Sequence, residues 1–454
     1  MKAVKQIKID TNELTIGMYV SGLDRPWTQT PFPLQGFYIR DREEIKQLKV
    51  HCNYVYIDVL KGSAPVKTDL RKLSNMGVKS KKNLRAESSA TAVSASPIRV
   101  RDDVYTEITP IGREIGEAKA LHQQVYRAVG TVLSQVNVDN QQVPIKETKR
   151  AASAMVDSIV RNPDAFTWLA KVREKDEHTY SHAVRSAVWA LLFGRHIGLP
   201  KPELDVLAMG VLLKDIGKTR LPRKLIEATE RTAEEQREYE QFVVYGLDIL
   251  KKLPEVKPRV ISVVKTHCER VNGSGFPSHL RGDKVPLLGK IAGIVTFYDE
   301  TTNPRNKNPL SPSKAVSMLY EARGTGFQDD LVVEFIRAIG LYPTGTLVEL
   351  NTGEVGVVVE QNFERRLKPR VMVVLDATKQ ELSTPRLIDL SEDEKQKRAM
   401  IDSGKYVAGE IEYVEISQDL KPGTYNIDIT NIRDEYIEST QAKGLLARLK
   451  EKLF

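Results

Sequence analysis

The chain has 454 residues, of which 41% are hydrophobic and 28% are charged, and its formal net charge at pH 7 is +8. This composition is typical of a folded globular protein and argues against an intrinsically disordered chain. The sequence has no run of about 18 apolar residues, which argues against a membrane span, and its two cysteines are too few for a disulfide framework. We therefore expect a cytoplasmic protein of several domains. The positive charge allows an anionic ligand.

The first part of the chain predicts a small α+β domain over residues 1–60. Apolar and polar residues alternate in 7–23, and 51–60 is rich in β-branched and aromatic residues, as strands are. A short helix is expected between them. Residues 61–100 are rich in Ser, Ala, Lys and Arg without a sustained period, which is typical of a linker. No aromatic residues interleave with the basic ones to stack on bases, so nucleic acid is not the expected partner.

Helical patterns dominate residues 101–341, and several of these helices are too apolar to lie on a surface. Residues 342–390 then predict a small β domain, with two strands joined by a turn at 351–354 and a third strand near 370. Residues 391–454 form an extension with a strand pattern near Tyr413 and a final amphipathic helix. That helix either lies on a membrane surface or docks on the protein itself. The overall fold class is mainly α.

Charged and ligand-type side chains fall at the ends of the buried helices. The helix over 204–213 is apolar all round, yet it ends in Lys214 and Asp215. Buried charges are costly unless they are paired or bind a metal. His182 and His267 occupy similar places, and a glycine-rich loop follows His267 at 271–277. Three such groups in one helical bundle predict a functional site.

The motifs resemble those of the HD-GYP family, helical metal-dependent phosphodiesterases that cleave the bacterial second messenger cyclic di-GMP. The resemblance runs from about 176 to 341 and is carried by KDIGK at 214–218, HCERVNGSGFP at 267–277 and IAGIVTFYDETTN at 291–303. It implies an HD-type helical bundle as the core. Residues 1–60 resemble a domain of unknown function often attached to one subgroup of the family. The segment GLYPTGTLVEL at 340–350 resembles that subgroup's carboxy-terminal extension.

The resemblance also implies a site of two or three iron or manganese ions, and this chain departs from it at four positions. Of the implied metal ligands, His182, Asp215 and His267 are kept. Lys214, Phe242, Cys268 and Thr296 replace the others. A protonated lysine has no lone pair with which to bind a metal. We therefore expect Lys214 to take the place of the cation and to neutralise Asp215, with Glu269 as a further candidate partner, and we expect no metal cofactor. A remnant mononuclear site made by His182, Asp215, His267 and Cys268 is the alternative.

A nucleotide site is expected at the glycine-rich loop. Its glycines leave backbone N–H groups open to a phosphate, Phe276 offers a surface for a base, and basic side chains after residue 299 lie where the family binds phosphates. The residues expected to bind a ligand are Gly273, Gly275, Phe276, Pro277 and Arg305. The competing interpretation of the loop is a simple turn.

The sequence thus predicts a degenerate HD-GYP protein that binds cyclic di-GMP or docks a partner signalling protein. The alternative is an active phosphodiesterase that yields linear pGpG or GMP, with iron or manganese and an atypical site in which Asp215 and Lys218 hold the family's catalytic positions. A homodimer is left open.

Overall fold

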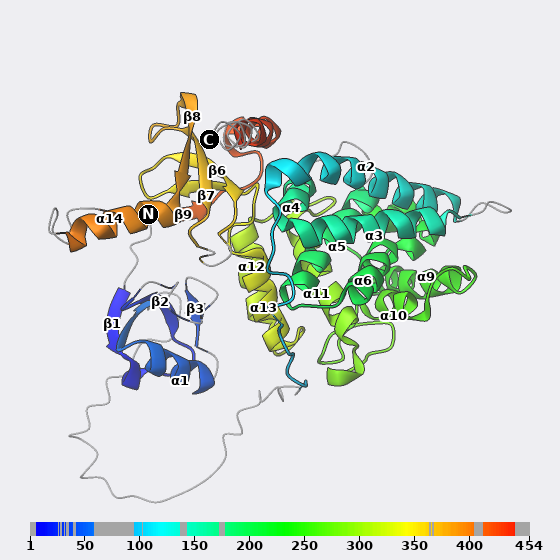
Figure 1. Ribbon diagram of the computed structural model, residues 1–454. Helices are drawn as coiled ribbons and strands as arrows, with labels where there is room; N and C mark the ends of the chain where they lie inside the picture. The colour runs from blue at the N-terminus through cyan, green and yellow to red at the C-terminus, as the bar shows by residue number, and fades with distance from the viewer. Residues whose placement is uncertain are drawn as a thin grey trace, which may run out of the picture. The chain divides into compact units, whose positions relative to one another are not determined.

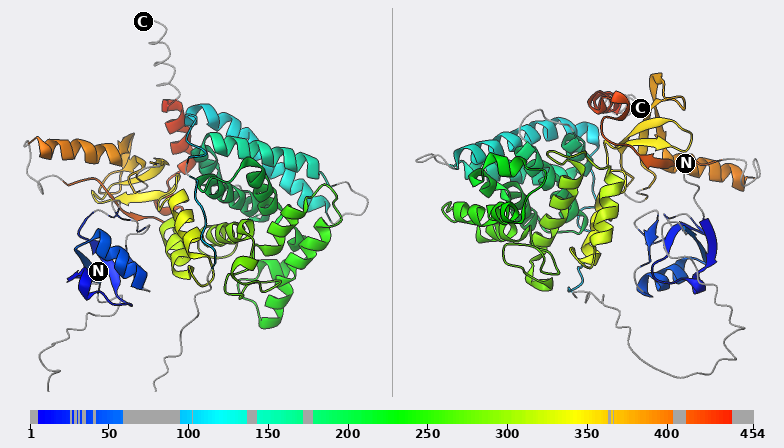
Figure 2. Two further views of the ribbon diagram at one scale, coloured as in Figure 1. Left: turned by 60° about the horizontal axis from the view of Figure 1, so that its bottom comes forward. Right: turned by 180° about the vertical axis from the view of Figure 1, so that it is seen from behind.

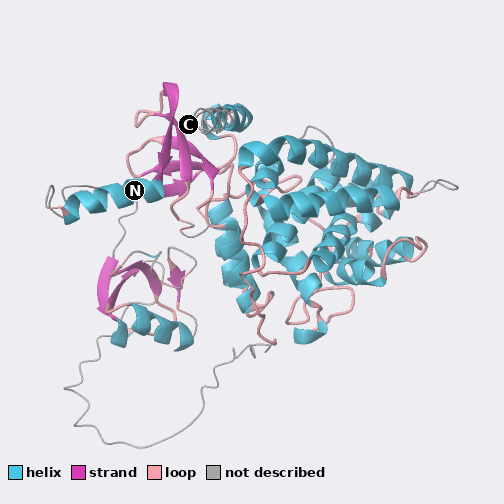
Figure 3. Cartoon of the chain, in the orientation of Figure 1, coloured by secondary structure: helices cyan, strands magenta, loops and turns pink. Residues whose placement is uncertain are grey.

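The computed structural model describes residues 6–58 (except 26, 28, 29, 31, 33–35, 40 and 41), 95–136 (except 102), 143–171, 178–403 (except 363, 364 and 366) and 412–440. Most of the expected linker and the final amphipathic helix therefore lie outside the described residues. The chain divides into two compact units, 1–91 and 92–454, whose elements are shown in Figures 1 and 3. No helix among the described residues is long and apolar enough to cross a membrane. The fold class is mainly α, as the sequence predicts.

The first unit is a four-stranded antiparallel sheet with one helix. Its strands pair in the order β1-β4-β2-β3. Central strand β4 buries Val55 and Ile57 completely, because alternate side chains of a strand point to the same face. The elements are β1 (Gln6–Asp10), η1 (Thr11–Glu13), β2 (Tyr19–Leu23), β3 (Phe37–Tyr38), α1 (Arg42–His51) and β4 (Tyr54–Asp58).

The second unit begins with the helical bundle (Figures 1 and 2). Several helices start at or just after a proline, which suits the first turn of a helix because it lacks an N–H that would have no partner there. The bundle consists of α2 (Ile111–Gln135), α3 (Ile145–Arg161), α4 (Pro163–Lys171), α5 (His178–His196), α6 (Lys201–Leu213), η3 (Ile216–Arg220), α7 (Arg223–Glu227), α8 (Ala233–Glu240), α9 (Phe242–Leu250), α10 (Pro258–Thr266), η4 (Gly282–Lys284), α11 (Leu287–Thr302), α12 (Pro312–Ala322) and α13 (Asp329–Ile339).

Helix α6 is the buried centre of this bundle. It packs on α3, α5 and α10, and every residue from Val206 to Leu213 is buried. At Gly210 a Cβ atom would lie 2.5 Å from Cβ of Val263, so glycine lets α10 approach closely. The helix has no polar face because it is packed on all sides. The charged residues that follow Leu213 are therefore buried as well.

A five-stranded antiparallel sheet completes the second unit, with strand order β8-β7-β6-β5-β9. The turn expected at 351–354 joins β5 to β6, while β9 comes from the extension after residue 390 and pairs with β5. The sheet is tied to the bundle by the Trp168 indole, which donates to the carbonyl of Val359 at 3.0 Å. The elements are β5 (Leu347–Leu350), β6 (Val355–Glu360), β7 (Arg370–Leu375), β8 (Glu381–Asp389), α14 (Leu390–Asp402), β9 (Ile416–Asp419) and η5 (Thr424–Asn426), followed by helix at 429–440.

Gly217 brings α9 against η3, and we predict that Gly217→Ala strongly destabilises the bundle. An added Cβ would lie 1.8 Å from the carbonyl oxygen of Phe242 and 2.4 Å from the amide nitrogen of Gly246, both backbone atoms that cannot rotate away. We expect a loss of about 3 kcal/mol, at the upper end for overpacking, measured by urea unfolding. The control is Gly116→Ala in α2, where nothing lies within 4 Å of the new Cβ. It should stabilise by about 0.5–1 kcal/mol, and equal effects of the two substitutions would contradict the packing argument.

Candidate functional site

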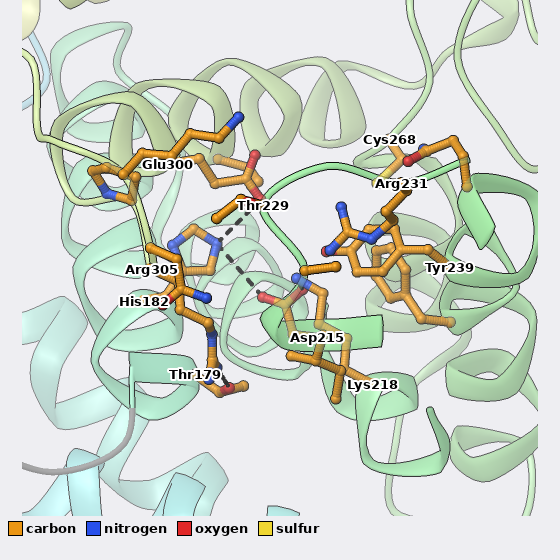
Figure 4. Close-up of a pocket in the computed structure, with 18 of the residues that line it drawn as sticks. Thr179, His182, Asp215, Lys218, Thr229, Arg231, Tyr239, Cys268, Glu300 and Arg305 are labelled. Atoms are coloured by element: carbon orange, nitrogen blue, oxygen red, sulfur yellow. Dashed lines mark hydrogen bonds and ion pairs between the residues drawn. The ribbon is translucent and has the colours of Figure 1, made fainter. Parts of the chain in front are cut away.

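A cavity of about 360 Å³ opens where α5, η3, α9, α10 and α11 meet. Figure 4 labels side chains of α5, η3, α8 and α11, and of the loops between helices, around this cavity. Its lining combines imidazoles, carboxylates, cations and aromatic rings. The residues are Thr179, His182, Asp215, Lys218, Ile226, Ala228, Thr229, Arg231, Gln236, Tyr239, Phe242, His267, Cys268, Arg270, Phe276, Thr296, Glu300, Pro304, Arg305, Asn306 and Lys307.

Asp215 lies between two lysine ammonium groups at the end of α6. The Lys214 ammonium, which is fully buried, donates to Oδ2 of Asp215, and Nζ of Lys218 lies 2.7 Å from Oδ1. Burial alone would raise the pKa of Asp215, but the two ammonium groups outweigh it and hold that pKa well below its usual value. The pairing expected for Lys214 is present. Glu269 instead accepts hydrogen bonds from the backbone N–H groups of Ser278 and Leu280.

His182 is oriented by a carboxylate. Its Nδ1 lies 2.7 Å from Oδ2 of Asp299, and Oδ1 of the same carboxylate accepts from Nε of Arg185 at 3.0 Å. Its Nε2 faces Asp215 Oδ2 at 3.6 Å and Glu300 Oε1 at 3.9 Å, as the dashed lines in Figure 4 show. Burial and the Lys214 charge lower the pKa of His182 despite Asp299. The imidazole is therefore neutral, and its lone pair points toward Asp215.

The imidazole of His267 is oriented by a hydrogen bond to a backbone carbonyl of α10. Its Nδ1–H donates to the carbonyl of Val264 at 2.8 Å, which leaves the lone pair on Nε2. Burial lowers its pKa to about 3. Within the described residues Nε2 has no hydrogen-bond partner, and the same holds for Oγ1 of Thr296. Both atoms belong to side chains that line the cavity.

Phe242 and Cys268 contribute an aromatic ring and a thiol to the cavity lining. The Phe242 ring packs edge-on against His267 and Phe276, with centroids 5.8 Å and 6.1 Å apart, and Nζ of Lys218 lies 4.9 Å from its centroid. Burial raises the pKa of Cys268 to about 12, so its thiol stays protonated. A protonated thiol is a poor nucleophile.

These donors do not fit a centre of two or three metal ions. Both oxygens of Asp215 are hydrogen-bonded to ammonium groups, and Phe242 has no donor atom. Over the described ranges, no group of three or more His, Cys, Asp or Glu side chains could hold a metal ion. The two imidazole lone pairs remain, and the charge of the Lys214 ammonium acts on both rings and lowers their pKa values.

The residues expected to bind a ligand separate into two groups. Phe276 and Arg305 line the cavity, and Nη2 of Arg305 donates to the Thr179 hydroxyl at 2.6 Å. Gly273, Gly275 and Pro277 are not among the lining residues. Gly275 packs against backbone, because a Cβ there would lie 2.4 Å from Cys268 O, and Gly273 has a φ of +81° in the turn. These contacts are those of a tight turn, and the binding role of the three residues stays a prediction.

Several lining residues lie outside every motif in the sequence. Arg231 stacks its guanidinium 3.9 Å from the Tyr239 ring centroid and donates to the carbonyl of Leu225. Both come from the segment around α8, which has no buried residue. The sequence likewise does not predict that Asp299 pairs with His182. Its position three residues after Thr296, on an otherwise apolar helix, was the available signal.

Comparison with protein families accounts for three parts of the chain. Residues 170–331 match an HD domain. Residues 6–146 match a domain of unknown function (DUF3391), and residues 347–403 match a KOW domain associated with HD domain.

Three known proteins illustrate the similarity. The cyclic di-GMP phosphodiesterase PA4108 of Pseudomonas aeruginosa is 25% identical over 84% of this chain and 88% of its own length. The 3'3'-cGAMP-specific phosphodiesterase 2 of Vibrio cholerae is 29% identical over 36% of this chain and 31% of its own. The solved structure of Bd1817, a HDG"Y"P protein from Bdellovibrio bacteriovorus, aligns with a TM-score of 0.43 at 15% identity, over 73% of this chain and 98% of that one.

The neutral state of His267 predicts a pH dependence of stability. Its pKa falls from 6.5 to about 3 on folding, so between these values the unfolded chain binds a proton that the folded chain does not. Stability must therefore fall as the pH falls, by about 2 kcal/mol between pH 7 and pH 5. We expect urea unfolding of His267→Gln to lose about 2 kcal/mol less over this interval than the wild type. Equal losses would show that His267 is protonated in the folded protein.

Proposed function

We propose that this chain binds cyclic di-GMP in the cavity and has lost metal-dependent hydrolysis, so that it acts as a nucleotide-sensing or partner-docking module. The observation that carries the proposal is the fully buried Lys214 ammonium hydrogen-bonded to Asp215. In the HD-GYP pattern a metal-binding histidine stands at this position. A tethered monovalent cation here replaces the charge of a metal without its Lewis acidity.

Electrostatics favours the lysine over a metal ion. A divalent cation about 4 Å from an ammonium is repelled by several kcal/mol at an intermediate effective dielectric. The Lys218 ammonium adds to this repulsion because it keeps its positive charge. Burial alone would lower the pKa of Lys218, but Asp215 outweighs this effect and raises the pKa well above its usual value. Displacing Lys214 would leave a buried ammonium without its carboxylate, which is costly.

The charge of the cavity supports an anionic ligand. Its lining includes five cationic side chains but only the carboxylates of Asp215 and Glu300, and the Asp215 charge is already neutralised. Arginine and lysine side chains of this kind bind phosphate oxygens strongly. The five cations are Lys218, which is paired with Asp215, and Arg231, Arg270, Arg305 and Lys307. A relative that matches most of the chain is named for cyclic di-GMP, and this supports the choice among phosphorylated ligands.

An active phosphodiesterase is the second candidate. It is favoured by the names of the relatives and by the two imidazole lone pairs that still face the cavity. Iron or manganese would be the metal and linear pGpG or GMP the product, with Asp215 and Lys218 at the family's catalytic positions. This candidate requires Lys214 to leave Asp215, and the buried pair opposes that movement.

We predict that the purified full chain binds cyclic di-GMP in the presence of a chelator, as measured by isothermal titration calorimetry. Arg305→Gln should weaken binding about tenfold or more, because a charged hydrogen bond to phosphate is lost. The matched control is Lys224→Gln, which removes an exposed cation of α7 that does not line the cavity, and it should leave the affinity unchanged.

The same preparation, reconstituted anaerobically with iron or manganese, should release no linear dinucleotide under conditions where a family enzyme with all its ligands does. Chromatography of the products is the measurement. Accumulation of pGpG or GMP would establish the second candidate in place of the first.

A further inference from the structure

The part of the cavity lining formed by His267, Thr296, Phe242 and Phe276 is called the floor below. Two of its polar atoms lack hydrogen-bond partners among the described residues. They are Nε2 of His267 and Oγ1 of Thr296, whose residues are 1% and 7% exposed. An unsatisfied buried polar atom costs about 1–3 kcal/mol, so such atoms in a cavity point to a ligand that satisfies them. Since Nδ1–H of His267 donates to Val264, its Nε2 can only accept a hydrogen bond. The Thr296 hydroxyl can donate.

The two side chains come from neighbouring parts of the fold. Helices α10 and α11 pack together, and at Gly293 a Cβ would lie 3.0 Å from the carbonyl oxygen of His267. Thr296 lies three residues after Gly293 and hence on the same face of α11. Both side chains line the same cavity, where His267 offers a hydrogen-bond acceptor and Thr296 a hydroxyl that can donate.

A phosphate group suits this floor poorly. A phosphate only accepts hydrogen bonds at its ionised oxygens, so it would oppose the lone pair of His267. The nearby ammonium groups of Lys214 and Lys218 are already engaged with Asp215. Phe242, at a position where the family resemblance implies a histidine, presents an aromatic ring, and Phe276 contributes a second. Aromatic rings pack well against a purine.

We propose that the floor takes the Watson–Crick edge of a guanine base, with the Thr296 hydroxyl donating to O6 and His267 Nε2 accepting from N1–H, while the cationic rim holds the phosphates. This inference rests on the proposed function and specifies how that ligand is oriented. Guanine presents an acceptor and a donor side by side on this edge, whereas adenine presents the reverse pattern. Metal-dependent hydrolysis at the same floor would instead require the phosphodiester to lie there.

The test is calorimetric titration of the full chain with cyclic di-GMP and cyclic di-AMP, in the presence of a chelator. We expect cyclic di-AMP to bind at least tenfold more weakly, because the lone pair on N1 of adenine would face the lone pair on Nε2 of His267. Thr296→Val keeps the side-chain shape but removes the hydroxyl, and it should weaken binding of cyclic di-GMP about tenfold while leaving binding of cyclic di-AMP unchanged. Thr296→Ser restores a hydroxyl and should recover most of the loss. Thermal unfolding of each variant checks that the bundle is intact.

The outcomes separate this inference from the proposed function. If both dinucleotides bind equally, or if Thr296→Val weakens both by the same factor, the guanine-edge orientation is refuted. In that case an effect of Arg305→Gln on both ligands would leave the proposed function standing. If the wild type binds neither dinucleotide, the proposed function fails and this inference fails with it.

Discussion

The buried pair of Lys214 and Asp215 is the interaction on which the rest of the site depends. Two features stabilise it in the interior. Lys214 is the C-cap of α6, so its charge lies at the negative end of the helix dipole, and Asp215 receives a second ammonium from Lys218. The pair is thus compensated by a helix end and by a further charge. Such compensation is what a buried ion pair needs to offset its loss of hydration.

This charge arrangement sets the state of both imidazoles. The Lys214 charge adds to burial in lowering the pKa values of His182 and His267. Each imidazole also gives its Nδ1–H to a fixed acceptor, Asp299 or the carbonyl of Val264. Both rings therefore present lone pairs in a defined direction. Such orientation by outer partners is usual for metal-binding histidines, and here it survives around an ammonium.

The sequence predicted those parts of the fold and site that depend on local pattern. The all-apolar face of α6 indicated a buried helix, so the charge pair at its end could be recognised and its pairing anticipated. Contacts between distant segments were not accessible in this way. Asp299 lies 117 residues from His182, and Arg231 enters the cavity from a segment without a motif. The close approach of Gly275 to the backbone of Cys268 likewise arises only from the tertiary fold.

Under the proposed function, the Lys214 ammonium takes the place of a metal ion, and this changes the signals to which the site responds. A metal centre depends on the supply of ions and on the protonation of its ligands, whereas a tethered ammonium is always present. The folded-state pKa of Asp215 lies well below its usual value and that of Lys218 well above, while both imidazoles are already neutral. The charge of the cavity floor is therefore constant across neutral pH. A site of constant charge responds to the concentration of its ligand alone, and under the proposed function this property suits a sensor better than a hydrolase.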